Sequence, residues 1–242
     1  MAAVNYGLDS PHRVRQMFGR GAWWLAFAVA IWFMNRQQYP GPATTLLLLL
    51  GIIGTAFLAA GAYMVWSSRA GKLALRDRLL DSLAPKDGEK ILDAGCGLGL
   101  MAIGAAKRIK SGKITAVDSW NPQMISGSSS DAVRDNAKLE GVADRIRVES
   151  GDLRNLAYSE GAFDAAVSVV ALRHMADEGD RDQSVREMYR VLKPGGRLLI
   201  FDVANVSRYA EILRDCGAVE VTVKPEGFLW CLPTRSVTAR KA

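Results

Sequence analysis

Two long apolar segments dominate the first third of the chain. Residues 43–66 contain no charged side chain, and as a helix they rise about 36 Å, more than the roughly 30 Å hydrocarbon core of a bilayer. This pattern predicts a transmembrane helix. Residues 22–34 are also uncharged and lie between Arg20 and Arg36, but they cover only about 20 Å as a helix. They fit a short spanning helix whose flanking arginines extend toward the membrane surface, and this is the preferred interpretation. The alternatives are a re-entrant segment and an interfacial segment.

A polar loop at residues 35–42 joins these segments, so together they predict a transmembrane hairpin over residues 21–68. Basic residues gather on both sides of the hairpin, whereas the loop carries only Arg36; the flanking ones are Arg13, Arg15, Arg20, Arg69, Lys72, Arg76 and Arg78. Because positively charged flanks stay on the cytoplasmic side, we expect both ends of the hairpin there. Residues 1–20 then form a cytoplasmic or interfacial segment. A cleaved signal peptide is the competing interpretation, but no clear small-residue cleavage site follows Met34.

Beyond the hairpin, the apolar pattern becomes that of an α/β domain. Residues 69–85 predict an amphipathic connecting helix with leucines among charged residues. Strand-like runs then cover residues 90–93, 114–118, 146–149, 163–170 and 197–203, and helical patterns cover residues 100–109, 131–140, 182–192 and 206–216. This alternation predicts a parallel sheet covered on both faces. The runs 219–224 and 234–240 have no convincing helix between them, so they predict a terminal antiparallel hairpin.

Two short sequences predict where elements end. The serines of residues 127–130 are expected to cap a helix that starts near Asp131. In residues 193–196, Pro194 is expected to stop the preceding helix, and Gly195 and Gly196 to turn the chain into the fifth strand. No chemistry is assigned to this second sequence.

Charge and cysteine content narrow the list of partners. The formal net charge is +6, and its basic residues lie beside the apolar segments, which favours anionic lipid headgroups over nucleic acid. The three cysteines are Cys96, Cys216 and Cys231. They show no metal-binding spacing and fit a reducing compartment, so no metal site is predicted.

The sequence with the clearest chemistry is the glycine-rich turn at residues 95–99. Gly95, Gly97 and Gly99 follow an apolar run that contains Asp93, and the next apolar run ends in Asp118. Bare backbone at a strand-to-helix turn approaches a ligand closely, and a carboxylate at the tip of the next strand holds a ribose. The spacing G-x-G-x-G differs from the dinucleotide fingerprint G-x-G-x-x-G, which favours S-adenosylmethionine over a dinucleotide.

With the further sequences 117–118, 151–153, 163–164 and 190–197, this turn makes residues 86–242 resemble a class I S-adenosylmethionine-dependent methyltransferase of the small-molecule type. The sequences occur in the order and at the separations of that family. The resemblance implies a Rossmann-like, doubly wound sheet of seven strands that ends in an antiparallel strand. The whole chain is therefore expected to hold two transmembrane helices followed by this α/β domain.

The resemblance also implies cofactor-binding residues, which are Asp93, Gly95, Cys96, Gly97, Gly99, Asp118, Ser119, Trp120, Asp152, Leu153 and Ser168. Asp93 and the backbone of the turn are expected to hold the methionine end, and Asp118 both ribose hydroxyls. Asp152 is expected to accept from the adenine amino group. Ser168 or Val169 is expected to line the methionine and substrate side. Simpler roles stay open: strand-end caps for Asp93 and Asp118, a turn for Asp152, and packing for Trp120.

The methyl acceptor and any catalytic base are less clearly marked. His174 follows the fourth predicted strand and is the best candidate base, although a lone histidine also fits a structural or exposed role. Arg173 fits either an anionic substrate group or a local ion pair. An asparagine-proline-proline-aromatic motif, typical of nucleic-acid and protein amino-methyltransferases, is absent from residues 168–171. That absence weighs against those substrates.

The segment before the hairpin supports a further hypothesis. Ser10 and Pro11 predict a helix start, and residues 1–11 are expected to fold over the cofactor pocket as a lid, with Tyr6 and Asp9 near the substrate. The alternative is an interfacial helix whose arginines contact lipid headgroups.

Together these observations predict an enzyme integral to the cell membrane, with its catalytic domain in the cytoplasm. We expect it to methylate a lipid-like or hydrophobic small molecule with S-adenosyl-L-methionine. A catalytically silent cofactor-binding scaffold is the alternative, and a nicotinamide-dependent oxidoreductase is a weaker one. The second apolar segment contains three glycines, Gly51, Gly54 and Gly61. They are expected either to let two copies of the chain pair in the membrane or to let the two helices of the hairpin pack closely.

Overall fold

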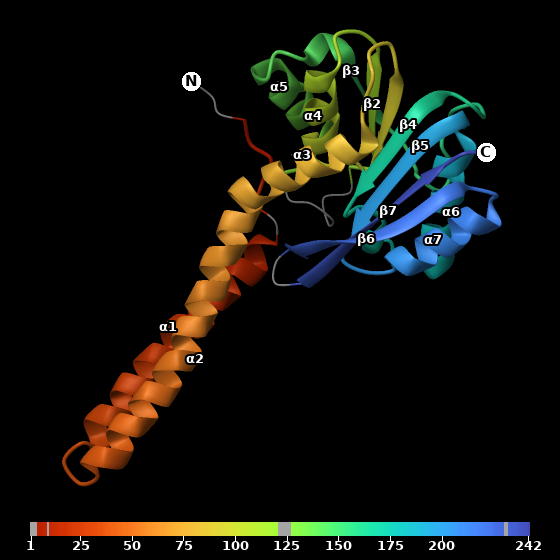
Figure 1. Ribbon diagram of the computed structural model, residues 1–242. Helices are drawn as coiled ribbons and strands as arrows, with labels where there is room; N and C mark the ends of the chain where they lie inside the picture. The colour runs from red at the N-terminus through yellow and green to blue at the C-terminus, as the bar shows by residue number, and fades with distance from the viewer. Residues whose placement is uncertain (1–3, 9, 121–126, 230–231) are drawn as a thin grey trace. The chain divides into compact units, whose positions relative to one another are not determined.

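The computed structural model describes residues 4–8, 10–120, 127–229 and 232–242 (Figure 1). The chain forms two compact units. One is a helical hairpin, Leu8–Gly71, and the other is an α/β unit made of Lys72–Ala242 with the N-terminal residues up to Gly7. These boundaries differ from the predicted segments 1–20 and 69–85, because residues 4–7 and most of the connecting helix belong to the α/β unit.

The hairpin consists of α1 (Pro11–Asn35) and α2 (Pro40–Trp66). Both helices are long and apolar enough to cross a membrane. They pack through glycines: a Cβ on Gly21 would lie 2.6 Å from Leu58 Cδ2, and one on Gly54 would lie 2.8 Å from Leu25 Cγ. A Cβ on Gly51 would meet no atom within 4 Å. Of the two roles predicted for these glycines, Gly54 therefore serves packing within the hairpin.

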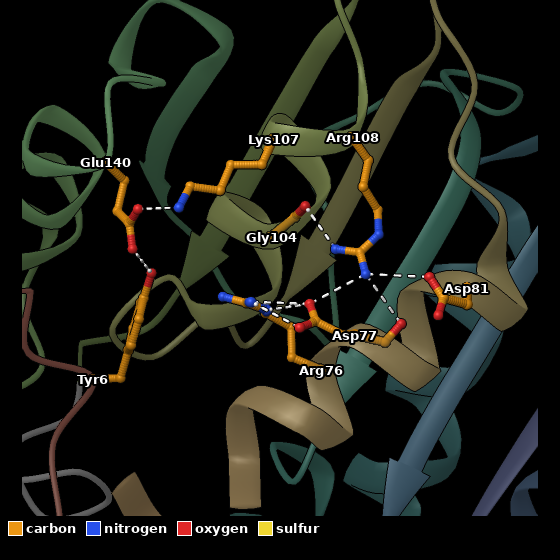
Figure 2. A network of polar contacts seen from close by, with 8 residues as sticks. All are labelled: Tyr6, Arg76, Asp77, Asp81, Gly104, Lys107, Arg108 and Glu140. Carbon is orange, nitrogen blue, oxygen red and sulfur yellow. Dashed lines mark hydrogen bonds and ion pairs between the residues drawn. The ribbon is translucent and has the colours of Figure 1, made fainter. Parts of the chain in front are cut away.

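A π-helical turn (Ser67–Gly71) follows α2, and α3 (Lys72–Leu83) begins the α/β unit. The buried face of α3 is formed by Leu75, Leu79, Leu80 and Leu83, as an amphipathic helix requires. Arg108 of α4 (Leu100–Arg108) donates to Asp77 and Asp81 of α3, and this network ties the two helices together (Figure 2).

The α/β unit is built on a seven-stranded sheet with the order β3-β2-β1-β4-β5-β7-β6. Its strands are β1 (Lys90–Ala94), β2 (Lys113–Asp118), β3 (Ile146–Ser150), β4 (Phe163–Val169), β5 (Leu192–Asp202), β6 (Val219–Leu229) and β7 (Leu232–Arg240). β1 to β5 pair in parallel, β7 is antiparallel to β5, and β6 is antiparallel to β7. The predicted Rossmann-like architecture and its terminal antiparallel hairpin are confirmed.

Helices cover both faces of the sheet, and each face has its own core (Figure 1). The cluster beneath α3, α4 and α5 (Ser130–Leu139) includes Ile91, whereas the cluster beneath α6 (Glu178–Arg190) and α7 (Val206–Asp215) includes Leu92. Neighbouring residues of a strand point to opposite faces, so β1 is apolar throughout because both of its faces are buried. The order of β1 and β4 reverses the winding at the centre of the sheet, where α/β folds place their ligand crevice.

The sequence around Pro194 differs from its prediction. The preceding helix already ends at Arg190, and residues 193–196 lie within β5 rather than before it. They form an irregularity in the pairing with β4, since Phe163 pairs with Leu192 and Ala165 with Arg197. The extra backbone groups are satisfied by the end of the chain, where Lys241 exchanges hydrogen bonds with Gly195 and Gly196 at 2.9 Å each. In contrast, the predicted cap is confirmed, because the Ser129 side chain accepts from the Ala132 amide at the start of α5.

Candidate active site

The glycine turn connects β1 to α4 at the carboxyl edge of the sheet. Gly95, Gly97 and Gly99 have φ values of 78°, 54° and 83°, in the left-handed region that side chains disfavour. A Cβ on Gly95 would lie 2.2 Å from the Cβ of Ala171, in the loop after β4. Glycine is therefore required here by both backbone conformation and space.

Asp93 supports the turn from behind. Its side chain is buried in β1, and one oxygen accepts from the Ala102 amide in the first turn of α4 at 2.8 Å. Burial, together with the nearby charge of Asp118, raises the pKa of Asp93 to about 7. Asp93 does not line the cleft described below, so the structure gives it the role of fixing α4 against β1.

Asp118, at the end of β2, holds the front of the turn. One carboxylate oxygen accepts from the Gly97 amide at 2.9 Å, and the other accepts from the Trp120 amide at 3.0 Å. Each carboxylate oxygen has two acceptor sites, so each retains one for a ligand. The Asp118 carbonyl also accepts from the Gly151 amide at 3.0 Å. Through these bonds the loops after β1, β2 and β3 all contact Asp118.

A cleft of about 810 Å³ opens beside this carboxylate, within the usual range for small-molecule sites. The predicted site residues that line it are Gly95, Asp118, Ser119, Asp152, Leu153 and His174. Further lining residues are Ser128, Ser150, Gly151, Arg154, Val169, Val170, Ala171, Met175, Ala176 and Asp180. The predicted residues that do not line it are Tyr6, Asp93, Cys96, Gly97, Gly99, Trp120, Ser168 and Arg173. Asp9 lies outside the described residues.

The predicted adenine acceptor, Asp152, is held by a residue that the sequence analysis did not single out. Arg154 donates to both oxygens of Asp152, with distances of 2.7–3.0 Å, and to Asp180 at 3.0 Å. The arginine lowers the pKa of Asp152 and keeps it ionised. Arg154 therefore connects the loop after β3 to the start of α6 along one wall of the cleft. Its position two residues after Asp152 was the signal available in the sequence.

Two predicted residues face away from the cleft. Ser168 is buried in β4 and donates to the Ala94 carbonyl at 2.8 Å, which fixes the ends of β4 and β1 together. The alternative at this position, Val169, does line the cleft. Trp120 has a φ of 54° and donates its indole N–H to Ser150 at 2.7 Å. Its ring packs against the core, which matches the packing role left open for it.

His174 and Arg173 lie after β4 in the short 3-10 helix Leu172–His174. The half-buried His174 lines the cleft, and its pKa is lowered mainly by burial and then by the charge of Arg173. Its imidazole is therefore neutral at neutral pH, as a base must be. The Arg173 amide donates to Asp202 at 3.2 Å. Burial raises the pKa of Asp202, and the positive charge of Arg173 lowers it. Arg173 thus fits the local ion pair better than a substrate contact.

The predicted lid is close to the glycine turn but does not cover the described cleft. The Asn5 amide donates to Asn136 on α5 at 3.1 Å, and the Tyr6 hydroxyl lies 3.2 Å from the carboxylate of Glu140 (Figure 2). The segment therefore folds back onto the α/β unit, as expected, but on the α4 and α5 side of the turn. Tyr6 is not among the residues that line the cleft.

Residues 91–196 match a family described as a methyltransferase domain. The chain is 36% identical over 129 residues to the methyltransferase GfsG of Streptomyces halstedii, covering 53% of this chain and 43% of that protein. It is 28% identical over 149 residues to the ubiquinone/menaquinone biosynthesis C-methyltransferase UbiE of Cereibacter sphaeroides, covering 62% of this chain and 52% of that protein. The chain spans about half the length of these curated relatives.

Solved structures show the same fold. The cyclase SpnF has a TM-score of 0.57 and 22% identity, covering 70% of this chain and 81% of its own. A SAM-dependent methyltransferase from Aquifex aeolicus has a TM-score of 0.55 and 18% identity, covering 69% of this chain and 89% of its own. At these identities the likeness concerns the fold alone.

Residues 91–196 thus match a methyltransferase domain, and both curated relatives are methyltransferases. The predicted enzyme class and the predicted cofactor, S-adenosyl-L-methionine, are confirmed for this domain. The nicotinamide alternative disagrees with this match.

Proposed function

We propose that the whole chain is a membrane-anchored methyltransferase that acts on a lipid-like or hydrophobic small molecule at the cytoplasmic face. The observation that carries the activity is the Asp118 carboxylate, which holds the glycine turn at 2.9 Å and faces the cleft. The membrane part rests on α1 and α2, which are long and apolar enough to span a bilayer. The basic flanks of the hairpin favour a cytoplasmic domain.

The residues around the turn fit the cofactor. Gly95 lines the cleft without a side chain, so its backbone is open to a ligand there, and Asp118 keeps an acceptor site on each oxygen for the ribose hydroxyls. Leu153 and Asp152 line the part of the cleft proposed for adenine. When bound, S-adenosyl-L-methionine supplies a methyl group on a positively charged sulfur that is already activated for transfer.

The acceptor side of the cleft is apolar. Val169, Val170, Ala171 and Met175 line it next to His174. An apolar lining excludes water and favours an acceptor of similar character, and the relative UbiE is a C-methyltransferase of ubiquinone/menaquinone biosynthesis. We propose that His174 accepts a proton from the acceptor as the methyl group transfers. Its lowered pKa leaves it free to do so.

The test uses the full chain in detergent or nanodiscs. Calorimetry measures S-adenosyl-L-methionine binding, and transfer of a radiolabelled methyl group into membrane lipid extracts measures turnover. Asp118→Asn is expected to weaken binding at least tenfold, because it removes the charge that holds two amides and both ribose hydroxyls. Asp215→Asn, on an exposed residue at the end of α7, is the matched control. Absence of cofactor binding by the wild type would contradict the proposal.

A silent scaffold predicts a different result. It would bind the cofactor with an affinity sensitive to Asp118→Asn but label no fraction of the extract. Labelling confined to water-soluble metabolites would retain the methyltransferase and reject the hydrophobic acceptor.

A further inference from the structure

The segment Asn5–Gly7 is fastened to the α/β unit at the back of the glycine turn. We refer to these three residues as the N-terminal strap. The strap precedes the hairpin in sequence, and Lys72 is the first residue of the α/β unit after it. The Lys72 ammonium donates to the carbonyls of Tyr6 at 2.7 Å and Gly7 at 2.6 Å. The two chain segments that enter and leave the hairpin are thus bonded to each other.

The strap reaches the turn through Asn136 of α5. Only 5% of this residue is exposed. Its side-chain oxygen accepts from the Asn5 amide at 3.1 Å, and its amide nitrogen donates to the Asn5 carbonyl at 3.0 Å and to the Leu98 carbonyl at 3.1 Å. Leu98 lies within the glycine turn. One buried amide therefore joins the strap to the turn, and loss of the strap would leave this amide without two of these three bonds.

Side chains reinforce the same connection. Gly7 has a φ of 75°, and a Cβ there would lie 2.9 Å from Leu98 Cδ1, so the strap backbone lies against the Leu98 side chain. Tyr6 bonds Glu140, which pairs with Lys107 of α4 (Figure 2). Burial raises the pKa of Tyr6, so its hydroxyl stays protonated as a donor. The strap thus contacts the turn directly and is connected to α4 through Glu140.

We propose that Asn136 and Lys72 are positioning residues that use the N-terminal strap to hold the glycine turn in its cofactor-binding conformation. Neither residue lines the cleft, so each acts through the turn. The expected effect on cofactor affinity rests on the proposed function. The hydrogen bonds that join the strap to the turn are present in the protein without ligand.

The experiment compares Asn136→Ala and Lys72→Met with controls on exposed residues of the same kind, Gln183→Ala and Lys110→Met. Hydrogen–deuterium exchange without cofactor measures protection of residues 95–100, and calorimetry measures S-adenosyl-L-homocysteine binding. Circular dichroism establishes that each variant is folded. Both test variants are expected to speed exchange in residues 95–100 and to weaken binding about tenfold, because Lys72→Met removes two hydrogen bonds and Asn136→Ala removes three. The controls should match the wild type.

Two outcomes would overturn the proposal: unchanged exchange in residues 95–100 while residues 4–7 become exposed, or faster exchange with unchanged affinity. If Asn136→Ala does not fold, Lys72→Met decides, because its aliphatic chain preserves most of the buried contact. If the wild type binds no cofactor, the proposed function fails, and the exchange result still decides whether the strap holds the turn.

Discussion

Three aspartates near the ends of neighbouring strands have different roles in this protein. Asp93 is buried and bonds α4, Asp118 lines the cleft while holding the turn, and Asp152 lines the cleft in a bidentate pair with Arg154. The difference is one of position along the strands, because Asp93 pairs with Ala116 inside the sheet, two residues before Asp118 at the end of β2. Both Asp118 and Asp152 line the cleft and accept from backbone amides, but the donors to Asp118 include the glycine turn, through Gly97, whereas the donor to Asp152 is Arg154, two residues on.

At the scale of single residues, the proposed role of His174 as a base predicts how turnover depends on pH. Its pKa is lowered by burial and by Arg173, and a base works in its neutral form. Turnover is therefore expected to fall as pH drops through this lowered pKa, and to be constant above it. His174→Gln should lower kcat about 10²-fold or more and remove this acidic limb. A pH profile of kcat measures both, with His12→Gln as the control. An acidic limb that persists in His174→Gln would assign it to another group.

The sequence identified candidate site residues better than it identified which of their side chains line the cleft. Gly95, Asp118, Ser119, Asp152, Leu153 and His174 were predicted, and all of them line the cleft. Ser168 and Val169 were alternatives that only the pleat of β4 could separate. Arg154 and Asp180 are far apart in sequence and meet only in the fold, so no local pattern marked their pairing.

At the scale of elements, the hairpin depends on small residues. Gly54→Leu is expected to lower stability by about 1–3 kcal/mol, because its side chain would meet Leu25 Cγ at 2.8 Å and the Gly21 carbonyl at 3.0 Å. Gly51→Leu is the matched control, since a Cβ there meets nothing within 4 Å. Thermal unfolding in detergent, followed by circular dichroism, compares them. Equal melting temperatures would contradict close packing at Gly54.

The order of helices and strands was predictable because periodicity is local. The boundary between α6 and β5, near Pro194, was not predictable in this way. The sequence predicts that the helix ends at Pro194. In the structure Leu192 already pairs with Phe163 in the sheet, so the helix ends earlier, at Arg190. The family resemblance implied that the sheet ends in an antiparallel strand, but the place of β7 beside β5 is seen only in the structure, since pairing between distant strands leaves no mark on either strand alone.

At the scale of the whole molecule, the proposed topology can be tested by labelling. In intact cells, an impermeant maleimide is expected to label Gln38→Cys, in the exposed loop between α1 and α2. It should label Lys86→Cys only after permeabilisation. The wild type, with its native cysteines, is the control. Labelling of Lys86→Cys but not Gln38→Cys in intact cells would reverse the topology, and release of the chain by alkaline carbonate would reject membrane insertion.

The bonds from Lys72 to the carbonyls of Tyr6 and Gly7 impose a rule of parity on that topology. Two groups in hydrogen-bond contact lie on the same side of any bilayer. The chain between them, residues 8–71, must therefore cross it an even number of times. An arrangement in which residues 43–66 span while residues 22–34 lie flat in the interface makes one crossing, and it would break the bonds that fasten the strap. The two apolar helices thus cross together or not at all.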